Sequence, residues 1–204
     1  MTSRAVILAS GSKARRDMLI AAGVVFEIQA ADIDEAAMRA SLEAEHGDDI
    51  VPPEDVAEIL AIAKAEAVSA LHPDALVIGA DQVLALHGEI FAKPADVAAA
   101  KAQLERLRGA THRLYSAVAV VRGGEMLFAH VDAAYLTMRE FSDDFLAAYL
   151  AQAGEAVTSS VGAYQLEGLG IQLFEAIDGD YFTILGMPLL LLLGELRRHG
   201  VIAD

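Results

Sequence analysis

The sequence predicts an α/β protein whose mixed sheet is flanked by helices. Short apolar runs rich in β-branched residues alternate with segments of helical periodicity along most of the 204 residues, and this alternation is typical of βα units. Two longer strand-like runs flank Gly123-Gly124, which indicates an antiparallel hairpin. Since both kinds of connection are expected, the sheet should be mixed. No Ser/Gly-rich linker marks a boundary, so we expect one domain over residues 1–204.

Capping and turn residues define the first elements. The apolar run Ala5–Ala9 predicts a strand, and Ser12 is a suitable N-cap for a short amphipathic helix that closes at Gly23. Residues 25–30 form a second strand candidate, and residues 31–40 read as an acidic loop. The chain is therefore expected to begin with a strand, a helix and a second strand.

A longer helix and a buried strand follow. Apolar side chains recur at helical spacing over Glu54–Leu71, with Lys64 at the edge of that face. Residues 75–94 read as a strand that emerges at Asp81, turns and returns to Lys93. A carboxylate at the carboxyl end of an apolar strand is where α/β proteins tend to place catalytic or ligand-binding groups. The alternative is a turn aspartate that accepts backbone N–H groups. Considered one at a time, Lys64 and Lys93 are interpreted as ordinary surface lysines.

The second half of the chain continues the alternation. Its expected elements are a helix capped by Asp96 and ending at Gly109, the hairpin over residues 114–138, a helix from Ser142 to Gly154, a Gly- and Ser-rich loop over residues 158–170, a strand over residues 171–177 and a last helix with Pro188 in its first turn. Proline fits a first helical turn because its missing N–H would have no intrahelical partner there.

The acidic composition argues against some classes of partner. The formal net charge is -15 and the sequence pI is about 4.6, which disfavours broad binding to nucleic acid or to anionic membranes. A phosphorylated small molecule stays compatible, because it needs only a local group of cations. Cysteine is absent, which fits a cytoplasmic location. The apolar tract over residues 181–194 is interrupted by Pro188 and is shorter than the roughly 20 residues of a membrane helix.

Three cations follow the first strand. Lys13, Arg15 and Arg16 fall in the first turn of the predicted helix, where unpaired N–H groups and the helix dipole already favour anions. Each cation costs roughly a few tenths of a kcal/mol there, so the arrangement suggests a bound anion. The sequence has no Walker-type phosphate loop, no dinucleotide-binding glycine motif, no nucleophile elbow and no paired zinc-binding histidines. Carboxylates and cations are therefore the candidates for chemistry.

Seven segments of the chain match motifs of one known family in the same order. They are LASGSKARRDMLIAAG, the IDE of Ile33–Glu35, LAIAKAEAV, IGADQV, the Lys93-Pro94 pair, HRLYSAVAV and AYQLEGLGIQLFEAIDGDYFTILGMPL. Together they resemble the Maf family of house-cleaning nucleotide pyrophosphatases over nearly the whole chain. The resemblance implies an α/β fold akin to that of the inosine-triphosphate pyrophosphatases, with two lobes around a central cleft, and a homodimer.

The resemblance also implies a reaction. A nucleoside triphosphate and water give the monophosphate and pyrophosphate, assisted by a divalent metal cation, Mg²⁺ or Mn²⁺. Six residues match the family's phosphate-binding, metal-binding and catalytic positions: Ser10 and Arg15 for the phosphates, Glu35 for the metal, Lys64 and Lys93 for charge on the phosphoryl oxygens, and Asp81 as general base. Phosphoryl transfer depends mostly on positioning and electrostatics, so no covalent nucleophile is needed.

Several positions depart from the commonest family pattern. Many members have S-x-S-P-R-R at the first motif, whereas Lys13 replaces the proline and Ala14 the first arginine. Gln82 and Glu167 stand where the branch acting on pyrimidine triphosphates usually has Thr and Gln. This pair is similar to the branch associated with 7-methyl-GTP, although that branch usually has an aromatic residue at the position of Ala14. We therefore expect 7-methyl-GTP as substrate, with Ala14, Gln82 and Glu167 at the nucleotide.

Alternatives from other classes remain at this point. The chain could be a dTTP/UTP pyrophosphatase of the same family, or a septum-associated cell-division regulator that binds nucleotide without turnover. A small sugar-nucleotide or phosphate-binding module is a third possibility, and such a module would not need Asp81.

Overall fold

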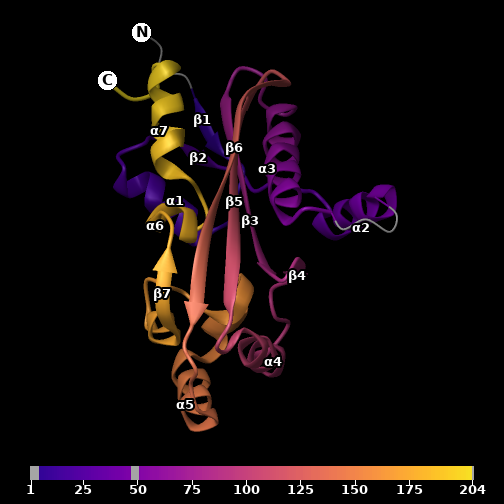
Figure 1. Ribbon diagram of the computed structural model, residues 1–204. Helices are drawn as coiled ribbons and strands as arrows, with labels where there is room; N and C mark the ends of the chain where they lie inside the picture. The colour runs from indigo at the N-terminus through magenta and orange to yellow at the C-terminus, as the bar shows by residue number, and fades with distance from the viewer. Residues whose placement is uncertain (1–4, 47–50, 204) are drawn as a thin grey trace. The chain divides into compact units, whose positions relative to one another are not determined.

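The computed structural model describes residues 5–46 and 51–203 (Figure 1). The chain forms two compact units. Unit 1 comprises Met1–Gln82, Tyr115–Asp132 and Asp180–Asp204, and unit 2 comprises Val83–Leu114 and Ala133–Gly179. Three strands, β3, β5 and β6, contribute residues to both units. The single domain expected over residues 1–204 stays a prediction.

The described residues form a seven-stranded mixed sheet in the order β2-β1-β3-β5-β6-β7, with β4 paired to β3. Its strands are β1 (Val6–Leu8), β2 (Glu27–Ile28), β3 (Leu76–Leu86), β4 (Glu89–Phe91), β5 (Thr111–Arg122), β6 (Glu125–Met138) and β7 (Phe174–Asp178). β1 is parallel to β2 and β3, whereas β4 is antiparallel to β3 and β7 to β6. The predicted fold class, a mixed α/β sheet with flanking helices, is confirmed.

The two faces of β3 in unit 1 meet different helices. Leu76, Ile78 and Ala80 join a core with apolar side chains of α1 (Lys13–Ala21) and α7 (Leu189–Arg198). Since side chains alternate along a strand, Val77, Gly79 and Asp81 face the other way, toward α3 (Pro53–Ser69). A Cβ on Gly79 would lie 2.1 Å from the Ala61 carbonyl oxygen of α3. Glycine therefore lets α3 approach β3 closely, near Asp81.

The acidic loop expected over residues 31–40 was a wrong prediction. Helix α2 spans Glu35–His46, and the Asp34 carboxylate accepts a hydrogen bond of 2.9 Å from the backbone N–H of Ala37. This is N-capping by an acidic side chain, which satisfies one of the unpaired N–H groups of the first turn. A residue that reads as part of a polar loop is therefore a helix start, and Glu35 is the first residue of the helix.

Unit 2 contains α4 (Val97–Leu107), α5 (Asp143–Ala153) and 3-10 turns over Gly154–Thr158, Val161–Ala163 and Leu169–Leu173. The predicted caps are confirmed, because Asp96 accepts from Ala99 N–H and Ser142 from Phe145 N–H. The strand expected over residues 171–177 begins only at Phe174, since the preceding residues form the last 3-10 turn.

A buried polar pair lies in the interior of unit 2. His112 is fully buried, and its Nε2 lies 2.7 Å from the Tyr164 hydroxyl. Phe174 contacts both rings. Burial lowers the pKa of His112 to about 4 and raises that of Tyr164, so both groups are neutral near pH 7.

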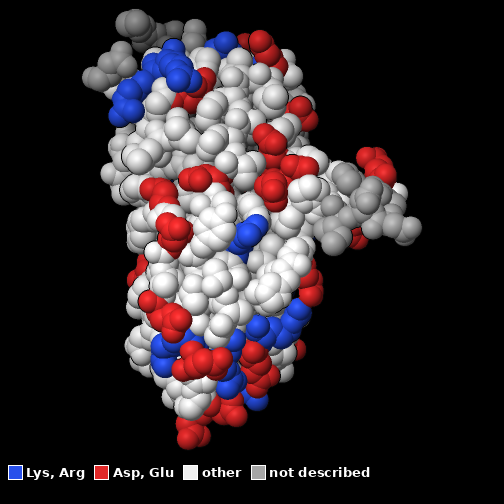
Figure 2. Space-filling model, in the orientation of Figure 1, with Lys and Arg blue, Asp and Glu red and all other residues white. Residues whose placement is uncertain are grey.

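Among the described residues, no helix is long and apolar enough to cross a membrane. On the face drawn in Figure 2, basic side chains gather near the end of α7 and around α4 and α5, among many acidic ones. The described residues on that face form no continuous basic surface of the kind that tracks a nucleic-acid backbone.

Candidate active site

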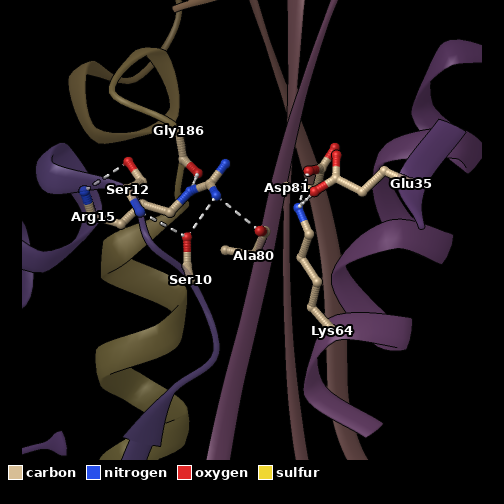
Figure 3. A network of polar contacts seen from close by, with 8 residues as sticks. All are labelled: Ser10, Ser12, Arg15, Glu35, Lys64, Ala80, Asp81 and Gly186. Carbon is tan, nitrogen blue, oxygen red and sulfur yellow. Dashed lines mark hydrogen bonds and ion pairs between the residues drawn. The ribbon is translucent and has the colours of Figure 1, made fainter. Parts of the chain in front are cut away.

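An ion-paired group of three side chains lies on the α3 side of β3. Lys64 Nζ is 2.6 Å from Asp81 Oδ1 and 2.8 Å from Glu35 Oε1 (Figure 3). Asp81 and Lys64 are buried, whereas the side chain of Glu35 is 44% exposed. The close packing of α3 on β3 places the Lys64 stem in the interior, so the prediction that Lys64 lies at the edge of the helix face understated its burial.

Asp81 keeps one carboxylate oxygen without a partner. Oδ1 contacts Lys64, while Oδ2 is buried and accepts no hydrogen bond from the described part of the chain. The expected strand end at Asp81 is wrong, because β3 continues through Asp81 to Leu86. The alternative of a turn aspartate is wrong for the same reason, and the contact comes from an ammonium group rather than from backbone N–H groups. A buried carboxylate oxygen without a donor is costly, and a water molecule or a substrate hydrogen would offset that cost.

The donor set near Lys64 suits a hard cation only in part. Within residues 5–46 and 51–203, no group of three or more His, Cys, Asp or Glu side chains could hold a metal by itself. Mg²⁺ usually takes one or two carboxylates together with waters and substrate phosphates. Glu35, whose half-exposed carboxylate contacts the Lys64 ammonium, fits that pattern as a single protein ligand and leaves Asp81 Oδ2 for a water molecule.

Arg15 forms the center of a second group, on the other side of β3 (Figure 3). Its Nη1 donates to Ser10 Oγ at 3.0 Å and to the Ala80 carbonyl at 2.8 Å, and its Nε donates to the Gly186 carbonyl at 2.8 Å. Ser12 caps α1 as predicted, since its hydroxyl accepts from the backbone N–H of Arg15. The guanidinium is thereby fixed at the first turn of the helix.

The charge of Arg15 is buried without a contacting carboxylate in the described residues. Arg15 is 8% exposed, and its guanidinium donates only to uncharged oxygens of the described residues. Burial lowers its pKa, and the more distant negative charges of Asp81 and Glu35 raise it. Arginine stays protonated in proteins, and buried charges are normally paired. The other first-turn cations, Lys13 and Arg16, instead pair with Asp17, so Arg15 is the one suited to an anionic ligand.

Gln82 points to the Arg15 side because it follows Asp81 along the strand. Its Nε2 lies 3.0 Å from Ser116 Oγ, 2.9 Å from the Ile184 carbonyl and 3.2 Å from the Thr183 carbonyl. Carbonyl oxygens only accept, so the nitrogen of the amide must face them. The donors of Gln82 are thus used within the protein, and Oε1 is the atom left to meet a ligand.

The sequence did not single out three of these residues. Ser116, Thr183 and Gly186 contact Gln82 or Arg15 from β5 and from the segment around α6 (Tyr181–Ile184). Two of them lie in the quoted motif ending GDYFTILGMPL, which was a signal without an assigned role. A one-turn helix such as α6 was not predicted at all, because four residues carry too little periodicity.

The remaining predicted site residues are placed as follows. Lys93 follows β4 and is exposed, and Glu167 is exposed in a turn of the loop that joins two 3-10 turns. Both belong to unit 2. Ala14 is partly buried next to Arg15 in α1. The contacts described above divide the other six residues by their side of β3. Ser10, Arg15 and Gln82 lie on one side, and Glu35, Lys64 and Asp81 lie on the other.

The fold and these contacts define an α/β protein with buried cations and carboxylates suited to a phosphorylated ligand. More specifically, the chain belongs to the Maf family, because the family model described as "Maf-like protein" matches residues 5–199.

Curated relatives match the chain over nearly its whole length. It is 57% identical over 194 residues to the "Nucleoside triphosphate pyrophosphatase" of Paramagnetospirillum magneticum, covering 95% of this chain and 98% of the relative. It is 53% identical over 197 residues to the "7-methyl-GTP pyrophosphatase" of Rhizobium etli, covering 97% of each chain. These matches confirm the resemblance found from the motifs.

Proposed function

We propose that this protein hydrolyses a nucleoside triphosphate, 7-methyl-GTP in particular, to the monophosphate and pyrophosphate. Near-full-length relatives carry the names nucleoside triphosphate pyrophosphatase and 7-methyl-GTP pyrophosphatase. A house-cleaning role follows from that reaction, since it removes modified nucleotides from the triphosphate pool. The homodimer and the cytoplasmic location implied by the resemblance stay predictions.

The observation that carries the proposal is the unpartnered Oδ2 of Asp81, buried beside the Lys64 ammonium. An ionised carboxylate in this position orients a water molecule and takes its proton, as a general base does. The water oxygen then bonds to phosphorus, the anhydride bond between the α- and β-phosphates breaks, and pyrophosphate leaves with the bond's electrons. The proton passes from Asp81 to solvent.

Charge on the phosphoryl oxygens is offset from several sides. Lys64 holds a positive charge between Asp81 and Glu35, and Lys93 would add a further cation. A divalent cation held by Glu35, waters and the substrate would supply further charge neutralisation at the phosphates. Arg15 and Ser10, at the N-terminal end of α1, would bind the triphosphate where helix N–H groups already favour anions.

Base selection is proposed for Glu167, supported by Gln82, whose Oε1 could accept a hydrogen bond from a base edge. Methylation at N7 gives guanine a delocalised positive charge and a more acidic N1–H, so a carboxylate gains from charge-assisted hydrogen bonds to it. Uracil and thymine offer one N–H between two carbonyls that would repel a carboxylate. The expected order of kcat/KM is therefore 7-methyl-GTP, then GTP, then UTP and TTP.

An assay of pyrophosphate release with Mg²⁺ tests the proposal on this panel of nucleotides. Asp81→Asn is nearly isosteric and should lower kcat on the order of 10²- to 10⁴-fold, since it removes the general base. Asp96→Asn is the matched control, because asparagine also caps helices and Asp96 caps α4 in unit 2. Near wild-type turnover in Asp81→Asn would contradict the role of Asp81. Binding without pyrophosphate release by the wild type would favour the regulator instead.

A further inference from the structure

The segment that ends α6 presents carbonyl oxygens to two side chains of the site. A helix leaves its last carbonyls without intrahelical donors, and α6 has only four residues. The Thr183 and Ile184 carbonyls accept from Gln82 Nε2, and the Gly186 carbonyl accepts from Arg15 Nε. One short segment is therefore held at two points, both in unit 1.

The hydrogen bonds on this segment have a fixed direction. The Ser116 hydroxyl donates to the Thr183 carbonyl at 2.7 Å, so its lone pair is left to accept from Gln82 Nε2 at 3.0 Å. A flipped Gln82 amide would place its oxygen against two carbonyl oxygens. Thr183 is held further through its hydroxyl, which donates to the Asp132 carboxylate at 2.9 Å.

Gly186 lies between Arg15 and Gln82. Its φ is +104°, and an added Cβ would lie 3.4 Å from Arg15 Nε, 3.5 Å from Arg15 Nη2 and 3.7 Å from Gln82 Cδ. Glycine is therefore suited to this position both by its backbone conformation and by the closeness of the guanidinium. Nη2 makes no hydrogen bond to the described residues (Figure 3), so the bonds through Nε and Nη1 set its direction.

We infer that Gly186 and Gln82 are positioning residues for Arg15, which together fix the guanidinium so that Nη2 faces the phosphates of the substrate. Gln82 acts through its amide nitrogen, which holds the Thr183 and Ile184 carbonyls and thereby the chain leading to Gly186. This inference rests on the proposed function, because it takes Arg15 to bind phosphate. It gives Gln82 a role that is independent of the nucleotide base.

Inhibition by pyrophosphate separates this role from base reading, because pyrophosphate has no base. Gly186→Ala should raise the inhibition constant of pyrophosphate about 10-fold or more, the scale of one lost charge-assisted hydrogen bond. KM should rise by a similar factor for every nucleotide, with their ranking unchanged. Gly200→Ala is the matched control, since Gly200 has φ +68° and no atom within 4 Å of an added Cβ. It also places a Cβ at a position of positive φ, without touching Arg15.

Gln82→Met provides a second variant that keeps the backbone of Gly186 intact. It should also raise the pyrophosphate inhibition constant, with thermal melting used to confirm folding of each variant. An unchanged inhibition constant in folded Gly186→Ala and Gln82→Met would overturn the inference, as would a change in nucleotide ranking without a change in pyrophosphate inhibition. Absence of pyrophosphate release from every nucleotide by the wild type would instead contradict the proposed function.

Discussion

Five buried side-chain atoms lack hydrogen-bond partners in the described chain, and two of them, one from each unit, have very different surroundings. Asp81 Oδ2 in unit 1 lies beside the Lys64 ammonium, within the electrostatic reach of Arg15. His112 Nδ1 in unit 2 belongs to a neutral ring packed on Tyr164 and Phe174. An unsatisfied buried atom indicates a reactive site only where charges surround it. At His112 the same feature reflects aromatic packing.

The largest effect should come from the charged site. Lys64→Met keeps the length of the apolar stem and removes the cation, and we expect kcat/KM to fall on the order of 10²- to 10³-fold, as when one group that stabilises developing charge is lost. The control is Lys101→Met, an exposed lysine paired with Glu105. Steady-state kinetics with 7-methyl-GTP measures both variants.

The free energy of unfolding of Lys64→Met gives a second test of the charged site. Removing one partner of a buried ion pair leaves the other charge uncompensated and is usually destabilising. Urea unfolding at pH 7 should therefore show a loss in Lys64→Met that a second change, Asp81→Asn, partly restores. A Lys64→Met protein with wild-type kcat/KM would show that the ammonium has only a structural role.

An effect of intermediate size is expected from the neutral His112–Tyr164 pair. It concerns the free energy of unfolding rather than the reaction. Burial lowers the pKa of His112 from 6.5 to about 4, so the unfolded chain binds a proton more readily than the folded one between these values. The contribution of neutral His112 to the free energy of unfolding is complete above about pH 6.5 and is lost as the pH falls to about 4. The shift corresponds to roughly 3 kcal/mol, at 1.36 kcal/mol per pKa unit.

Urea unfolding between pH 7.5 and pH 4.5 measures this loss. In His112→Phe an apolar ring replaces the titrating one, so the part of the pH dependence of the free energy of unfolding that is due to His112 should disappear. The value of kcat/KM at pH 7.5 should stay near that of the wild type. If the free energy of unfolding had the same pH dependence in the wild type and in His112→Phe, the pKa of His112 would not be lowered by folding, and this prediction would be wrong.

The smallest effect should come from Glu167, which is exposed in unit 2. Glu167→Gln should reduce the preference for 7-methyl-GTP over UTP by roughly 1–3 kcal/mol, the scale of one bidentate base contact, with pyrophosphate inhibition unchanged. The ratio of kcat/KM values for the two nucleotides measures it. A wild-type protein that prefers UTP or TTP would exclude 7-methyl-GTP as the selected substrate, and would leave the pyrophosphatase proposal in place.

The sequence by itself determined features that depend on local physics. Ser12, Asp96 and Ser142 were identifiable as helix caps because a short polar side chain at this position can accept a hydrogen bond from the N–H three residues later. Each of them does so in the structure. The Gly123-Gly124 hairpin was identifiable because both glycines take positive φ. The ordered motifs were sufficient to indicate the Maf family, which a match over residues 5–199 confirms.

Only the tertiary structure decided how these residues meet. The Lys64–Asp81 pair joins positions 17 residues apart, and the Arg15–Gly186 bond joins positions 171 apart. The alternation of side chains along β3 then put Asp81 and Gln82 on opposite sides, so that the predicted site residues of unit 1 form two groups. A local pattern carries no information about which distant carbonyl a guanidinium will reach, because that depends on how α1, β3 and α6 pack together.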